Sequence, residues 1–244
     1  MSTIKWLPVF FVTFTILIGL GCQTNHHWNP LLLKKKKPVS IETKTPLSKL
    51  ERAILLQKSG DELAAVIAYR EVIACSRNRN EIDSAKIGAA ECLIRIKKFP
   101  AALTVLEPLP LDVATENDMK KLALAGEILL HIGRFKEAET YLELAVGSLD
   151  LESLLDQVHS DATLELAPWI PAATANLGCA YLKNDKPEYA MMMYQFASCL
   201  YYRCGNQIFA ERSQRIYDDL VSVMRQYAPF KPVPVAKGFP PGRM

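Results

Sequence analysis

One pattern of small and large residues recurs along most of this chain, and it restricts the fold more than any other feature. In two segments a small residue, Gly126 or Gly178, is followed by a large residue three positions later, Ala after twelve, a large residue after sixteen and Ala after nineteen. Weaker copies of the pattern start at Ala53 and Ala90. Such recurrence is typical of stacked helix pairs, because each pair needs its neighbours to bury its apolar face.

Composition agrees with helices. The chain has 244 residues, of which 50% are apolar, so it is long enough to bury a sizeable core. It contains only 11 glycines and is rich in Ala and Leu, which favour helix. Runs of Val, Ile and Thr that would favour strands are scarce. The sequence therefore predicts an all-α fold.

The recurring offsets resemble those of the tetratricopeptide repeat (TPR) family, in which each repeat is a pair of antiparallel helices. The resemblance covers roughly residues 46–228. It implies that Ala on the second helix lies at the closest crossing of the pair, and that the large residue four positions later packs on the next repeat. The positions that carry the resemblance are Ala53, Gly60, Ala65, Tyr69, Ala90, Leu93, Phe99, Ala102, Gly126, Leu129, Gly133, Phe135, Ala138, Leu142, Ala145, Leu177, Gly178, Tyr181, Ala190, Tyr194 and Ala197.

Aligning these positions predicts a TPR helical-hairpin solenoid of about four repeats. The repeats lie near 46–79, 83–116, 119–149 and 171–204, and a capping helix follows over 206–227. Leucines spaced as on one helix face predict an inserted helix over 150–160, which is either a partner site or a spacer that covers a seam. The proline-rich segment 229–244 is expected to be extended or disordered.

The first residues of the chain have the features of an export signal. Residues 6–21 are an apolar run that is short for a membrane span but suits a secretory signal. The small residue before Cys22 resembles the lipobox of bacterial lipoproteins, which implies a signal peptide over 1–21 and a lipid on Cys22. A flexible basic linker over 22–45 would follow. An uncleaved anchor is the alternative, because the four lysines at 34–37 resist export.

The TPR resemblance also implies a binding face lined by the first helix of each pair. The candidate groove residues are Ile87, Glu91, Arg95, Lys120, Glu127, His131, Cys179 and Lys183, and the alternative is that they are ordinary surface residues. The positions at which the family's carboxylate clamp carries diagnostic Asn residues hold Ile54, Glu91, Glu127 and Cys179. Capture of a chaperone C-terminus is therefore not expected.

The sequence contains none of the common catalytic or phosphate-binding motifs. The sequence contains no G-x-S-x-G, no phosphate-binding G-x-x-x-x-G-K-[ST] and no H-E-x-x-H. We therefore expect no catalytic, cofactor-binding or metal site, and no enzyme. The basic residues gather at the two ends and leave a mildly acidic body, which does not favour a nucleic-acid partner. Whether Cys75, Cys92, Cys179, Cys199 and Cys204 form disulfides stays open.

These features together predict a membrane-attached scaffold or adaptor in the bacterial cell envelope. It would face the periplasm or the cell exterior and bind other envelope proteins or peptides through its concave face, and the outer membrane is favoured because Gln23 follows the cysteine. One alternative is a self-associating spacer or recruiter that pairs through Tyr201, Tyr202 and the Met191–Met193 run. A thiol-based redox component is the other.

Overall fold

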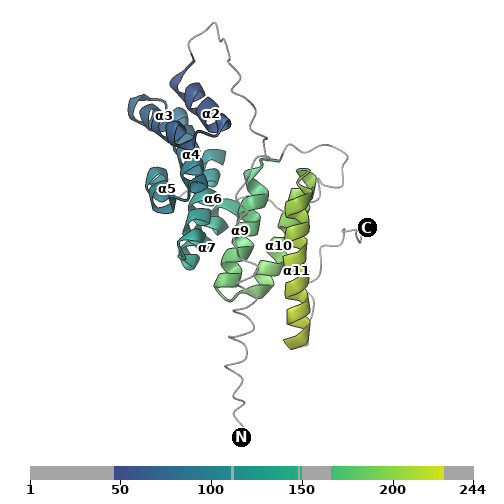
Figure 1. Ribbon diagram of the computed structural model, residues 1–244. Helices are drawn as coiled ribbons and strands as arrows, with labels where there is room; N and C mark the ends of the chain where they lie inside the picture. Colours follow the sequence, from purple (N-terminus) through teal and green to yellow (C-terminus); the bar gives the residue numbers. More distant parts are fainter. Residues whose placement is uncertain (1–46, 111–112, 148, 150–165, 228–244) are drawn as a thin grey trace.

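The computed structural model describes residues 47–110, 113–147, 149 and 166–227, and within those ranges every regular element is an α-helix. The predicted all-α fold is confirmed for that part of the chain. The helices, shown in Figure 1, are α2 (Lys49–Ser59), α3 (Glu62–Cys75), α4 (Arg79–Arg95), α5 (Phe99–Leu106), α6 (Glu116–His131), α7 (Phe135–Gly147), α9 (Trp169–Lys183), α10 (Pro187–Arg203) and α11 (Gln207–Tyr227).

Several predictions fall outside the described residues. They are the signal segment 1–21, the lipidated Cys22 with its linker 22–45, the inserted helix 150–160 and the proline-rich tail 229–244.

Side-chain caps determine where α4 and α6 begin. Asn78 Oδ1 accepts a hydrogen bond from the amide of Asn80 at 3.0 Å. At α6, Thr115 Oγ1 accepts from the amide of Asp118 at 3.2 Å, and Asp118 Oδ2 accepts from the amide of Thr115 at 3.1 Å. Both helices start a few residues before the repeats expected near 83 and 119, because cap chemistry and not repeat spacing fixes a helix start.

The two helices of each hairpin are joined by the same turn. One residue adopts the left-handed conformation, with φ between 58° and 85°, at Gly60, Lys97, Gly133 and Asp185. The amide after it reaches back to the carbonyl five residues earlier, as from Arg134 to Leu129 at 2.9 Å. This is the Schellman pattern, which satisfies carbonyls that the helix end leaves open.

Alanines lie where the helices of a hairpin cross. Ala53, Ala65, Ala90, Ala102, Ala138, Ala145, Ala190 and Ala197 are all 0% exposed. The large side chains between the paired helices are buried as well, whereas Phe99 and Phe135 at the turns are half-buried. The alternation of size in the sequence thus corresponds to close helix contact in the structure.

Large residues on the second helix pack over glycines on the first. A Cβ added at Gly126 would lie 2.4 Å from Leu142 Cγ, and one at Gly178 would lie 3.1 Å from the ring of Tyr194. Leu142 and Tyr194 therefore fill the seam of their own hairpin. Tyr69 at the same offset contacts the next hairpin instead, since a Cβ added at Gly88 of α4 would lie 2.4 Å from Tyr69 Cζ. The expectation that Leu142 and Tyr194 also pack on the next repeat stays a prediction.

The pair α10–α11 repeats the geometry of the earlier hairpins. Ser198, Tyr201 and Ala210 stand at the same offsets as the small residue, the large residue and the Ala of those hairpins. The turn contains Gly205 with φ 69°, and Asn206 donates to the carbonyl of Tyr201 at 2.9 Å. Helix α10 thus serves as the second helix of one hairpin and the first helix of the next.

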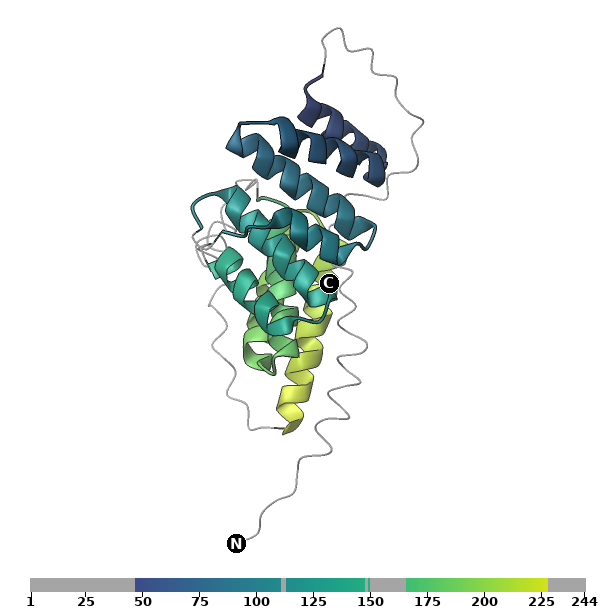
Figure 2. The ribbon, with the colours of Figure 1, turned by 90° about the vertical axis from the view of Figure 1, so that its left-hand side faces the viewer.

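Helix α6 lies between two hydrophobic cores. Its residues Ala125 and Ile128 belong to the core formed with α2–α5, which we call the first core. Its residues Leu122 and Leu129 belong to the core formed with α7 and α9–α11, which we call the second core. Figures 1 and 2 show the hairpins stacked in chain order, from α2 at the purple end to α11 at the yellow end.

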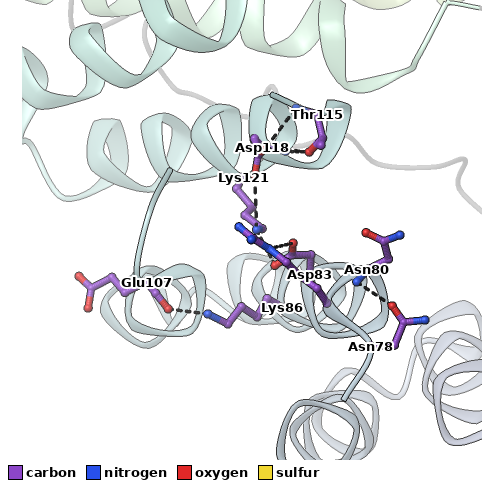
Figure 3. A network of polar contacts seen from close by, with 9 residues as sticks. Asn78, Asn80, Asp83, Lys86, Glu107, Thr115, Asp118 and Lys121 are labelled. Carbon is purple, nitrogen blue, oxygen red and sulfur yellow. Dashed lines mark hydrogen bonds and ion pairs between the residues drawn. The ribbon is translucent and has the colours of Figure 1, made fainter. Parts of the chain in front are cut away.

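A buried lysine ties the second hairpin to the third. Lys121 of α6 is 5% exposed, and its Nζ lies 2.6 Å from Asp83 Oδ1 of α4 and 3.8 Å from Asp118 Oδ1 of its own helix. Figure 3 shows this network, with Lys86 donating to the carbonyl of Glu107 nearby at 2.6 Å. Because a buried charge requires a partner, this network specifies how α4 and α6 are placed.

Candidate functional site: a hollow between three helices

The first helices of three hairpins line an open hollow, whose empty space is ≈ 700 Å³ when open solvent is included. The lining comes from the C-terminal end of α4, the middle of α6 and the N-terminal half of α9. The lining residues are Glu91, Ile94, Arg95, Lys120, Ala123, Leu124, Glu127, Pro168, Trp169, Ala172, Ala173 and Asn176. The hollow thus spans helices that are far apart in the sequence.

Most of the residues that line the hollow are apolar. Ile94, Leu124 and three alanines come from the three helices, and Trp169 stands at the start of α9. The Trp169 indole Nε1 donates to Glu116 Oε1 at 3.3 Å, which links the start of α9 to the start of α6. Indole offers a large apolar surface to a ligand while its N–H stays occupied.

The two cations at the hollow, Lys120 and Arg95, each lie beside a carboxylate. Lys120 Nζ lies 2.8 Å from Glu91 Oε1, and Glu91 Oε2 accepts from Gln57 Nε2 at 2.9 Å. Arg95 Nε lies 3.2 Å from Glu62 Oε1. Each cation thus has a nearby carboxylate that is mostly shielded from water, although Arg95 Nε itself makes no hydrogen bond among the described residues.

Asn176 differs from these charged residues. It is 1% exposed, it borders the hollow, and its Oδ1 meets no hydrogen-bond donor among the described residues. A buried carbonyl without a donor costs on the order of 1–3 kcal/mol, so such atoms are rare in folded proteins. Among the features of the hollow, this amide points most directly to a ligand.

Half of the candidate groove residues gather at the hollow. Glu91, Arg95, Lys120 and Glu127 border it, and they come from α4 and α6. Their role in binding a partner stays a prediction.

The other four candidates do not border the hollow. Ile87 is 4% exposed and Cys179 is 2% exposed, so both are buried. The His131 ring stacks on Phe99 at a centroid distance of 4.3 Å, and Lys183 Nζ lies 5.6 Å from the centre of the Phe135 ring. These four side chains therefore lie outside the hollow, and their assignment to a binding groove stays a prediction.

Sequence reasoning missed the residues that give the hollow its character. Trp169 and Pro168 precede the predicted start of the fourth repeat near 171, and Asn176 was not singled out. The sequence does contain one indication of Asn176, because this polar residue lies within a helix that is otherwise mainly apolar. A polar residue in such a helix requires an explanation.

The cysteines show little sign of thiol chemistry. Cys75, Cys92, Cys179, Cys199 and Cys204 all lie in the described part of the chain, and none of them forms a disulfide there. Cys92 and Cys179 are buried, whereas Cys75 and Cys204 are exposed. Burial raises the pKa of the Cys199 thiol to about 12, and burial likewise raises the pKa of Cys92. Both thiols therefore stay protonated at neutral pH, where a reactive cysteine would be a thiolate.

Two features are absent from the described residues. Those residues contain no group of three or more His, Cys, Asp or Glu side chains placed to hold a metal ion. Their helices also lack the length and hydropathy needed to span a bilayer.

No family model matches the sequence, and neither a curated protein nor a solved structure matches it significantly.

Proposed function

We propose that this protein is a TPR-type scaffold, attached to a membrane by its N-terminal segment, whose hollow between α4, α6 and α9 binds a segment of another envelope protein. The observation that carries the proposal is the hollow itself, with a mainly apolar lining and the unsatisfied Oδ1 of Asn176. Binding sites commonly combine an apolar surface with a few polar groups that fix orientation.

The shared geometry of the hairpins supports the TPR assignment. Four hairpins use the same left-handed turn and the same buried alanines at their crossings. The array therefore presents its first helices side by side, and the hollow lies along them. A site assembled from three first helices suits a helix or an extended segment of a partner.

Membrane attachment through Cys22 is part of the proposal. The apolar run 6–21 followed by a cysteine supports a lipoprotein signal, and two or three acyl chains would anchor the chain stably. Metabolic labelling with a fatty acid tests this step. We expect label and removal of the signal in the native chain and neither in Cys22→Ala, whereas a full-length unlabelled membrane protein would point to an uncleaved anchor.

Photocrosslinking in cells tests the binding site. A benzoyl-phenylalanine in place of Leu124 at the hollow should give a discrete crosslinked product with an envelope protein. The same residue in place of Thr140, which is exposed on α7, is the matched control and should give none. Identical products from both positions, or none from position 124, would contradict the proposal.

A self-associating spacer is the second candidate. Tyr202 is 72% exposed on α10, and Met192 on the same helix is also exposed, which favours a contact between copies. Tyr201, Met191 and Met193 are buried within the chain and cannot take part. Sedimentation should show a dimer that Tyr202→Ser weakens if this function holds, and a monomer at all concentrations if it does not.

A further inference from the structure

We infer that the hollow accepts an uncharged, apolar, internal stretch of a partner polypeptide, and that the amide of Asn176 pairs with a main-chain peptide group of that stretch. The inference rests on the proposed function, since it specifies what the scaffold holds. Three features of the hollow lead to it, namely its lining, its unsatisfied amide and its paired charges.

The lining selects an apolar side chain. Ile94, Leu124 and Trp169 border the hollow and offer apolar surface to a Leu or Phe side chain. Placing such a side chain there removes its apolar surface from water, which stabilises the complex by roughly 1.5–3 kcal/mol. A Lys or Glu side chain in the same place would lose its hydration without gaining a partner.

The amide of Asn176 selects a peptide group. Its Oδ1 lacks a donor, and a main-chain N–H supplies one. A peptide group also carries a carbonyl, so it complements the side-chain amide in either orientation of the oxygen and nitrogen. An apolar ligand without a peptide group would leave Oδ1 as it is in the free protein.

The paired charges disfavour a terminal carboxylate. A carboxylate that bound Lys120 would share the ammonium with Glu91, and one that bound Arg95 would share the guanidinium with Glu62. In either place it would lie beside a like charge that is largely shielded from water, which weakens its binding. The hollow therefore differs from a site that recognises the charged end of a chain.

The test uses defined peptides and the full-length chain labelled with 5-fluorotryptophan. The main probe is acetyl-Ala-Ala-Phe-Ala-Ala-amide, and it is compared with a version with Glu at the centre, versions N-methylated at one backbone position each, and the free acid Ala-Ala-Phe. Binding is followed by the fluorine signal of Trp169, which the Trp169→Phe variant identifies among the three tryptophans.

We expect the capped probe to shift the Trp169 signal and the Glu probe to bind at least about tenfold more weakly. N-methylation at one position should weaken binding about fivefold to tenfold, the effect of one lost hydrogen bond. Asn176→Leu should lower affinity by a similar factor and remove the effect of N-methylation, whereas Asn80→Leu on the exposed start of α4 should change neither. Raising the salt concentration should alter the affinity less than about twofold, because no charge is exchanged.

Other results would overturn the inference. Tighter binding of the free acid than of the capped probe, or a steep loss of affinity with salt, would indicate a charge-recognising site. Equal binding of all N-methylated probes to the native chain would remove the role of Asn176, even if Asn176→Leu fails to fold. If no probe moves the Trp169 signal while crosslinking from position 124 persists, this inference fails and the scaffold function stands. If neither the Trp169 signal nor the crosslink from position 124 is observed, both this inference and the scaffold function fail.

Discussion

The first core and the second core, which share α6, are held by different kinds of contact. In the first core, Tyr69 donates its hydroxyl proton to Gln57, Gln57 donates to Glu91, and Glu91 pairs with Lys120. These contacts link α3, α2, α4 and α6 in one polar chain. Tyr69 also packs over Gly88, so this chain runs from the first hairpin into the second.

The second core relies on large apolar side chains. Tyr194 is 1% exposed, and the rings of Tyr201 and Phe209 stack at a centroid distance of 5.3 Å. Met191 and Met193 fill the remaining space. Polar contacts occur here too, since Tyr181 donates to Glu143 at 2.9 Å. Because apolar burial is more tolerant of detail than polar pairing, the comparison teaches that the polar chain across four helices constrains position in the first core, whereas packing of large side chains dominates in the second.

The largest expected effect comes from removing an aromatic anchor of the second core. Tyr194→Ala should lower the free energy of unfolding by about 4 kcal/mol, because it leaves a cavity over Gly178. Urea denaturation followed by circular dichroism would measure the loss. Tyr202→Ala on the same helix is the control and should cost less than about 0.5 kcal/mol, as its side chain is mostly in water. A comparable loss in both variants would break the distinction between the cores.

The next largest expected effect on stability comes from removing the cation of the buried Lys121–Asp83 ion pair. Lys121→Met should lower the free energy of unfolding by about 3 kcal/mol, because it leaves the Asp83 carboxylate without its close cation. The double variant Lys121→Met with Asp83→Leu should recover at least half of that loss in the same urea measurement. If the double variant is no more stable than the single one, the lysine acts by packing alone and the first core resembles the second.

A smaller effect is expected where α6 meets α7. Gly126→Ala should cost about 2 kcal/mol, because the added Cβ would lie 2.4 Å from Leu142 Cγ and the neighbour must shift. Gly147→Ala is the matched control, since no atom lies within 4 Å of the added Cβ. Thermal unfolding should show a lowered midpoint only for the first variant, and equal midpoints would mean that α7 yields easily.

The smallest effect concerns the turns that both cores share. Lys97 has φ 59° and stands where Gly133 has φ 81°. Lys97→Gly should stabilise the protein by about 0.5 kcal/mol, since relief of left-handed strain outweighs the greater freedom of the unfolded chain. Gly133→Ala should destabilise it by about 1 kcal/mol. Calorimetry resolves both signs, and a loss of stability in Lys97→Gly would show that its side chain has a role in the turn.

Much of the helix pairing could be predicted from the sequence, because it depends on residue size. Few residue types other than Ala fit at a helix crossing, and few other than Gly fit at a left-handed turn. The pattern can therefore be recognised from the sequence. Lys97 and Asp185 adopt the same turn without glycine, and the recurrence of the offsets around them was still sufficient to locate it.

The hollow was harder to predict, because it depends on how separate hairpins approach one another. Glu91 and Lys120 could be placed on one face, but their pairing with each other depends on the distance between α4 and α6. Trp169 and Asn176 belong to a helix whose start is not set by the repeat spacing. The double use of α10 was also missed, because a repeat search expects each helix to belong to one pair.

The position of α6 limits how this molecule can be divided. Its residues Ile128 and Leu129 are adjacent in sequence yet belong to different cores. A truncated form that ends before α6 would expose the apolar face of α4 and α5, and one that starts after α6 would expose that of α7 and α9. The cooperative unit of unfolding is therefore larger than one hairpin, and fragments that fold will be those that retain α6 with a neighbour on each side.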